Sequence, residues 1–191
     1  MPGTVPPSVL RLIRNGDPVP ASFSDAEKVA FAGVNAFYKK GFGYAEMMNT
    51  RPQTIGYGLS DSPVGLAAFF YDKFAAWTDS GGEPERVLTR NEMLADITLY
   101  WLTNTGTSSS RSYWDATQLG GGPFNAFDIK NVPVAVTVFP GEIYRAPRSW
   151  AEQSFHKLIY WNEVDKGGHF AAWEQPELFV AEVRAAFRSL R

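Results

Sequence analysis

Two short runs of β-branched and aromatic residues limit most strongly what this chain can fold into. Residues 132–139 (VPVAVTVF) and 158–164 (LIYWNEV) lack a helical period and are typical of buried strands. Between them, Pro147 begins a short helical pattern that continues to Phe155. A strand, a helix and a second strand form a βαβ unit, which predicts two parallel strands joined by a right-handed crossover.

Two parallel strands do not make a stable sheet by themselves, because parallel ladders normally lie inside larger sheets that are covered on both faces. One more amphipathic helix is predicted from Pro176 to the last residue, with its apolar residues on one face. The sequence therefore predicts a partial α/β fold, either the second half of a larger α/β protein or one chain of an obligate complex. The alternative is a two-stranded remnant packed under the helices.

The first two thirds of the chain are predicted to be helical. Two pairs of residues have the spacing of capping boxes, and apolar residues follow each pair at helical intervals: Ser24 with Glu27, and Thr89 with Glu92. The helices expected here cover residues 25–39, 63–77 and 90–101. Residues 50–63 contain Gly56, Gly58 and two prolines, so we expect irregular backbone there.

Composition and charge argue against several classes of protein. The 191 residues include 18 Lys and Arg against 20 Asp and Glu, so the chain lacks the basic surface that nucleic acids require. Without cysteine it cannot form a disulfide scaffold, a thiolate metal site or a cysteine nucleophile. With only two histidines, His156 and His169, we expect no metal site, and nothing in the sequence calls for a cofactor.

The sequence also argues against a membrane span. The longest uncharged and mainly apolar stretches, residues 62–71 and 131–141, are far shorter than the roughly 20 residues that a spanning helix needs. The first twenty residues contain scattered prolines and arginines, unlike a signal peptide. We therefore expect a cytoplasmic protein. The 15% of aromatic residues suits an apolar cavity, a large interface or a plain core.

One acid and one histidine follow the two predicted strands. Glu142 lies just after the first strand and His169, preceded by two glycines, lies after the second. Open α/β sheets keep their sites at this edge, and Glu142 could there orient the His169 ring and stabilise its charged form. The alternatives are a hydrogen-bonded histidine in a turn and a carboxylate that is solvated or paired with Arg145 or Arg148.

Four long segments resemble one protein family. They are TRPQTIGYGLSDSPVGLAAF (residues 50–69), LYWLTNTGTSSSRSYW (99–114), VPVAVTVFPGEIYRAPRSWAE (132–152) and VDKGGHFAAWEQPELFVAEVR (164–184). In this order the chain closely resembles the C-terminal half of the microsomal-type epoxide hydrolases, members of the α/β-hydrolase superfamily, from about residue 43 to residue 191. The resemblance implies a proline-rich linker at 1–23, a helical cap at 24–125 and the C-terminal part of the core, with its last two strands, at 126–191.

The resemblance also implies the roles of four residues. His169, in GGHF, matches the general base of the family, and Glu142, in FPGE, matches the acid that orients this base. Tyr113, in SSSRSYW, and Tyr44, in the pair GY ahead of TRPQT, match two cap tyrosines that donate hydrogen bonds to the epoxide oxygen. In that family a carboxylate attacks the epoxide to give an alkyl-enzyme ester, which water activated by the histidine then hydrolyses.

Tyrosine suits the task of protonating an opening epoxide. A phenol with a pKa of about 10 keeps its proton at neutral pH, so two phenols can stabilise and protonate the developing alkoxide. Tyr38 and Tyr57 lie near Tyr44 in the sequence and are alternatives to it. Packing in a core or interface with a bonded hydroxyl is the alternative role for both tyrosines.

The chain departs from the family in its nucleophile. The Asp on a strand-to-helix turn and the His-Gly-x-Pro segment belong upstream of residue 1, and neither occurs in the sequence. Residues 58–62 (GLSDS) are not a nucleophile elbow, and we interpret Asp61 as a capping residue and Asp165 as a strand-end residue. The proline-rich start resembles the linker between core and cap, so we expect the chain to begin at an internal Met.

The leading hypothesis is therefore an epoxide hydrolase segment that acts on a small apolar epoxide once a complementary N-terminal part is supplied. The second hypothesis is an inactive binding or interaction module, with the cap holding an apolar ligand. Under either hypothesis an open strand edge predicts a partner chain or a homo-oligomer. A third, weaker hypothesis is hydrolysis by Glu142 and His169 alone, which would be feeble without a nucleophile.

Overall fold

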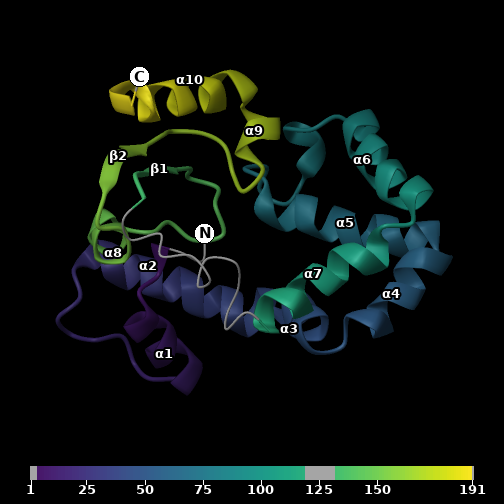
Figure 1. The fold of residues 1–191 in the computed structure, drawn as a ribbon, viewed down its shortest axis with the longest axis horizontal. Coiled ribbons are helices and arrows are strands. Elements are labelled where there is room, and N and C mark those ends of the chain that lie inside the picture. The colour runs from purple at the N-terminus through teal and green to yellow at the C-terminus, as the bar shows by residue number, and fades with distance from the viewer. Residues whose placement is uncertain (1–3, 119–131, 191) are drawn as a thin grey trace. The chain divides into compact units, whose positions relative to one another are not determined.

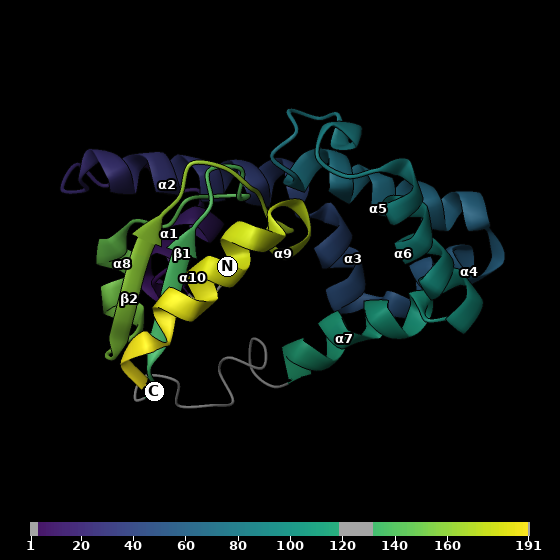
Figure 2. The ribbon, with the colours of Figure 1, turned by 90° about the horizontal axis from the view of Figure 1, so that it is seen from above.

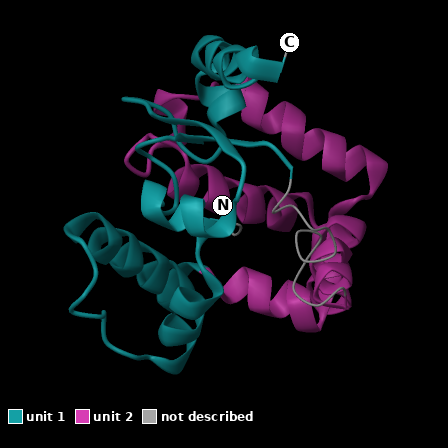
Figure 3. Ribbon diagram, turned by 60° about the vertical axis from the view of Figure 1, so that its left-hand side comes forward, with its two compact units in different colours: residues 1–41, 128–191 teal, residues 42–127 magenta. Residues whose placement is uncertain are grey.

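The computed structural model describes residues 4–118 and 132–190. The chain forms two compact units, which Figure 3 colours separately. The first unit contains residues 1–41 and 128–191, and the second contains residues 42–127. The expected boundary between cap and core, at residues 125 and 126, lies outside the described residues.

The first unit is built on a two-stranded parallel sheet (Figure 1). Strand β1 (Val134–Val138) pairs with β2 (Leu158–Glu163), and helix α8 (Arg148–Ser154) lies between them in the sequence. An isolated parallel bridge between Gly141 and Gly168 extends the pairing past the ends of both strands. The predicted βαβ order and the parallel pairing are thus confirmed.

The two faces of β1 contact different helices. Val136 and Val138 are buried on one face, where they pack against Ala151 of α8 and against Phe155, which follows this helix. Thr137 lies between the two valines and so points to the opposite face. The strand therefore has an apolar side under α8 and a polar side away from it.

A single carboxylate joins that polar side to the C-terminal helix. Helix α10 (Pro176–Ala186), followed by the 3-10 turn Arg188–Leu190, crosses the two strands (Figure 2). Its Glu182 carboxylate accepts three hydrogen bonds of 3.0 Å each, from Thr137 Oγ1, Tyr160 Oη and Asn162 Nδ2. These bonds fix α10 on the same two strands that Glu142 and His169 follow in the sequence.

Two N-terminal helices complete the first unit. Helix α1 (Pro7–Asn15) and helix α2 (Asp25–Ala36), which continues into the π-helical turn Phe37–Gly41, pack around the fully buried Trp150. The unit therefore includes a helix inside the stretch that was expected to be a linker, and α2, which was expected in the cap. Pro7 begins a helix instead of preventing one, because a proline in the first turn has no hydrogen bond to lose.

The second unit has only helices as regular secondary structure in its described part. Its elements are α3 (Gly43–Thr50), α4 (Pro52–Asp61), α5 (Pro63–Trp77), the 3-10 turn Pro84–Arg86, α6 (Arg90–Thr103) and α7 (Gly106–Gln118). Both predicted capping boxes are present, at the starts of α2 and α6. Helix α5 is capped by Ser62, whose hydroxyl accepts a hydrogen bond from Gly65 N, so the capping role expected of Asp61 is wrong.

The expectation of irregular backbone over residues 50–63 is also wrong, because α4 occupies most of this stretch. Its Gly56 is buried against α7, where Thr107 Oγ1 donates a hydrogen bond of 3.0 Å to the Gly56 carbonyl oxygen. A Cβ atom built on Gly56 would lie 2.6 Å from Thr107 Cγ2 and Oγ1. The glycine therefore allows two helices to pack closely. From the sequence alone, this role of a glycine cannot be distinguished from a role in a turn.

This contact gives a stability prediction. Replacing Gly56 by alanine is expected to destabilise the chain by about 1–3 kcal/mol, since overpacking against Thr107 outweighs the better helix propensity of alanine. Gly58→Ala on the same helix is the matched control: nothing lies within 4 Å of its Cβ position, and we expect a gain of about 0.5–1 kcal/mol. Urea unfolding followed by circular dichroism measures both. Equal effects of the two substitutions would contradict the packing argument.

Among residues 4–118 and 132–190, no helix combines the length and the apolar character needed to cross a lipid bilayer.

Candidate active site

The parallel pairing of β1 and β2 brings the predicted acid and histidine into contact. His169 Nδ1 lies 2.7 Å from Glu142 Oε1. The Gly141–Gly168 bridge fixes the backbone between them, with Gly141 N donating to Gly167 O at 2.9 Å. The Glu142 side chain is 9% exposed and the His169 side chain 33%, so a largely buried acid holds an accessible ring.

The turn before His169 requires glycine. Gly167 has φ = +102°, a conformation that other residues rarely adopt. A Cβ atom there would lie 2.8 Å from Phe139 Cδ1. After the turn, the buried Glu174 at the end of α9 (Ala171–Glu174) accepts a hydrogen bond of 3.1 Å from Phe170 N. The backbone on both sides of His169 is therefore held in place.

The electrostatics of the pair favour a charged acid. Burial raises the pKa of Glu142, but hydrogen bonds from His169 and from Ile143 N (2.8 Å), together with the charge of His169, outweigh burial and lower this pKa overall. In the tautomer that carries the proton on Nδ1, His169 donates this proton to the ionised Glu142 and Nε2 is the basic nitrogen. The alternative pairing with Arg148 is not formed, since Arg148 Nε donates to Glu152 at 2.7 Å.

The lowered pKa has a consequence for stability. Because the folded state holds the Glu142 proton less tightly than the unfolded state, the pair stabilises the fold fully above the ordinary carboxyl pKa of 4.5 and loses this contribution as the pH falls through the lower folded-state pKa. Urea unfolding at several pH values should show Glu142→Gln less stable than the unsubstituted chain at pH 7, with the difference disappearing in acid. The control Glu152→Gln removes an exposed carboxylate and should show no such trend. A deficit in Glu142→Gln that stays constant with pH would contradict the prediction.

The two predicted tyrosines meet inside the second unit. Tyr44 on α3 and Tyr113 on α7 have ring centroids 5.8 Å apart at an interplanar angle of 81°. Burial raises the pKa of Tyr44, and the charge and hydrogen bonding of Tyr113 raise it further, so Tyr44 keeps its proton at neutral pH. Tyr57 is 70% exposed, and Tyr38 packs against the core of the first unit, so Tyr44 is the residue placed beside Tyr113.

Lys73 was not among the residues predicted from the sequence. Its ammonium group lies over the Tyr44 ring, 4.5 Å from the centroid. The sequence signal for this lysine was the spacing of Phe69, Lys73 and Trp77 along α5, which places a cation between two aromatic residues on one helix face.

Among the described residues, His, Asp and Glu side chains do not gather in groups of three or more that could hold a metal ion.

Known proteins resemble the chain in sequence and in fold. No family model matches the chain. A putative epoxide hydrolase from Stigmatella aurantiaca is 52% identical over 170 residues, which are 88% of this chain and 37% of that protein. Epoxide hydrolase 1 from Sus scrofa is 40% identical over 152 residues, 74% of this chain and 33% of that protein. The chain belongs to the epoxide hydrolase family.

The solved structures of epoxide hydrolases extend this result to the fold. The crystal structure of juvenile hormone epoxide hydrolase from Bombyx mori superposes with a TM-score of 0.79 at 26% identity, covering 97% of this chain and 47% of that chain. The protein thus has a partial α/β-hydrolase fold, in which a two-stranded parallel sheet accompanies a helical segment. It spans about a third of the length of the Stigmatella aurantiaca and Sus scrofa relatives.

Proposed function

We propose that this chain supplies the water-activating pair and the epoxide-holding tyrosines of an epoxide hydrolase, which converts a small apolar epoxide and water into a vicinal diol. The observation that carries the proposal is the 2.7 Å contact between His169 Nδ1 and Glu142 Oε1 at the C-terminal ends of parallel strands. Sites of open α/β sheets lie at this edge. The relatives named epoxide hydrolase support the choice of reaction.

In the proposed reaction a carboxylate outside this chain opens the epoxide. It attacks one ring carbon, the bond from that carbon to the ring oxygen breaks, and the oxygen takes a proton from Tyr44 or Tyr113. The product of this step is an ester between the enzyme and the opened substrate. Phenol donors aimed at the oxygen stabilise its negative charge as the charge develops.

His169 then acts on water. Its Nε2 takes a proton while the water oxygen attacks the ester carbonyl, and collapse of the tetrahedral intermediate releases the diol and restores the carboxylate. The proton on His169 then returns through solvent to the tyrosine that protonated the epoxide oxygen. Glu142 stabilises the imidazolium that forms, and it holds the ring with Nε2 as the base. The buried position of Glu142 and the rigid turn at Gly167 support this orienting role.

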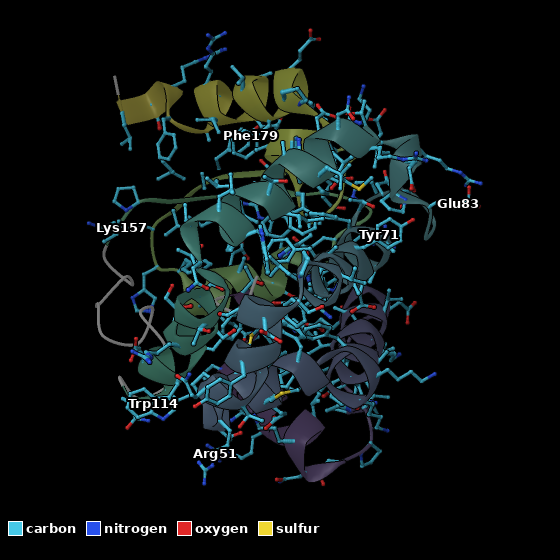
Figure 4. The ribbon with its side chains drawn as sticks, turned by 90° about the vertical axis from the view of Figure 1, so that its right-hand side faces the viewer. Arg51, Tyr71, Glu83, Trp114, Lys157 and Phe179 are labelled. Carbon is cyan, nitrogen blue, oxygen red and sulfur yellow. The ribbon has the colours of Figure 1, made fainter. Side chains whose placement is uncertain are left out.

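An exposed apolar surface of the first unit supports the proposal that this chain binds a partner. Helix α10 and the residues that follow it expose large apolar side chains that the described residues leave uncovered, and Figure 4 labels Phe179 among them. They are 37–56% exposed and comprise Phe179, Val180, Val183, Phe187 and Leu190. We propose that a complementary N-terminal part of the α/β-hydrolase core covers this face and carries the nucleophilic carboxylate.

Reconstitution tests the proposal. The chain is co-expressed with the part of the Stigmatella aurantiaca relative that precedes the matched region, and conversion of styrene oxide to its diol is measured on the purified complex. We expect diol from the complex and none from either part alone. A complex of the two parts that forms but does not hydrolyse styrene oxide would overturn the proposal.

A second function, an inactive binding module, is favoured by one observation. In the second unit the rings of Tyr44, Phe69 and Trp77 form a cluster that could hold an apolar ligand. The chain alone would then bind styrene oxide as a homo-oligomer, without turnover in any complex. Light scattering with equilibrium dialysis distinguishes this outcome from the first.

A further inference from the structure

Lys73 is held among aromatic rings beside one of the proposed epoxide donors. Its Nζ atom lies 4.5 Å from the ring centroid of Tyr44, 5.4 Å from that of Trp77 and 5.5 Å from that of Phe69. Phe69, Lys73 and Trp77 recur every four residues on α5, whereas Tyr44 comes from α3. The Lys73 side chain is 17% exposed.

Packing alone does not account for a cation at this position. Withdrawing an ammonium group from water costs free energy that a methionine of similar length would not lose. Lys73 also pairs with Asp72, but the Asp72 side chain is 68% exposed, and a pair with an exposed partner contributes little. The three ring faces are therefore the main compensation for the lost hydration.

The geometry of Tyr44 shows what the cation acts on. Lys73 lies over one face of the ring, and the Tyr113 ring meets Tyr44 edge to face, at 81°. The Tyr44 ring is thus confined from two directions. Its hydroxyl belongs to the pair that we assign to the epoxide oxygen.

We propose that Lys73 is a positioning residue for Tyr44: its ammonium group fixes the ring and polarises the hydroxyl into a stronger hydrogen-bond donor toward the epoxide oxygen. This inference rests on the proposed function. A cation at the ring face draws electron density from the phenol, which makes the hydroxyl proton more positive. Burial raises the pKa of Tyr44 and so weakens it as an acid. A nearby positive charge favours the ionised form of a phenol, so the proposed action of Lys73 opposes the effect of burial.

The first test uses the chain by itself. The chain is labelled with [ζ-13C]tyrosine, and the Tyr44 resonance is assigned as the one that Tyr44→Phe removes. At neutral pH we expect Lys73→Met to move this resonance by more than its linewidth, because methionine keeps the packing but removes the charge. We expect the Tyr44 resonance of Lys73→Arg to stay at its position in the unsubstituted chain, because a guanidinium also lies on aromatic faces.

A matched control and a fold check accompany these variants. Lys28→Met removes a lysine of the first unit whose side chain is 44% exposed, and it should leave the Tyr44 resonance in place. Far-UV circular dichroism verifies the fold, and Lys73→Gln takes the place of Lys73→Met if that variant is unfolded. An unmoved resonance in the uncharged variant, or an equal displacement in Lys73→Arg, overturns the inference.

The second test separates this inference from the proposed function. Styrene oxide added to the labelled chain should move the Tyr44 and Tyr113 resonances if both donate to an epoxide. If it moves neither while Lys73→Met still moves that of Tyr44, the epoxide role fails and the coupling of lysine to tyrosine stands. In the reconstituted complex, Lys73→Met should lower kcat about tenfold with KM unchanged, and Lys73→Arg should recover most of this loss. A change in KM alone overturns the polarising role.

Discussion

In the reconstituted complex, His169→Gln is expected to lower the turnover of styrene oxide by about 10²–10⁴-fold, the usual contribution of a positioned general base. Glutamine can still accept a hydrogen bond but cannot take a proton from water. Ester formation does not require the histidine, so the alkyl-enzyme should accumulate. Steady-state kinetics measure the loss, and mass spectrometry of the quenched complex detects the ester on the complementary part.

The other histidine provides the matched control. His156 lies in the exposed turn before β2, and His156→Gln should leave turnover unchanged. Full activity in His169→Gln would remove the base from the proposed mechanism. Loss of turnover without ester would show that the histidine acts earlier, during ring opening.

The second large effect is expected from the tyrosine pair. Tyr44→Phe and Tyr113→Phe should each slow ester formation by about 10²–10³-fold, the usual cost of removing one donor to a developing oxyanion. Because both hydroxyls serve the same oxygen, the loss in the double variant should be smaller than the product of the two single losses. Single-turnover experiments with styrene oxide measure the step directly.

Tyr57→Phe is the control for this series. The Tyr57 side chain is 70% exposed, and removing its hydroxyl should leave the rate unchanged. A normal rate of ester formation in the double variant would assign the acid to another group. A defect only in the later hydrolysis step would place the tyrosines on the water side of the reaction.

The βαβ unit and the candidate pair at its edge were predictable because each depends on local patterns. A run such as VPVAVTVF has no helical period, and parallel pairing brings the carboxyl ends of the two strands together wherever the rest of the chain lies. Glu142 and His169 therefore follow from strand order alone. The placement of Tyr44 beside Tyr113 was available only from the family resemblance, because α3 and α7 are far apart in the sequence.

The interpretation of residues 50–63 was wrong because glycine and proline have more than one use. Pro52 lies in the first turn of a helix, where a proline is tolerated. Gly56 allows α7 to pack closely against α4. Lys73 was missed because its partner Tyr44 lies on another helix. The role of this lysine depends on that tertiary contact, which the sequence does not show.

The discontinuous first unit determines when its core can form during synthesis. Ser149, next to the buried Trp150, donates a hydrogen bond to Glu27 across 122 residues of sequence. At ribosomal rates of 5–20 residues per second, the second residue of this pair emerges about 6–25 s after the first. During that interval the apolar faces of α1 and α2 lack their native partner, whereas the second unit, continuous in sequence, can fold as soon as it leaves the ribosome. The helices α1 and α2 are thus made before the second unit, but they find their place in a core after it.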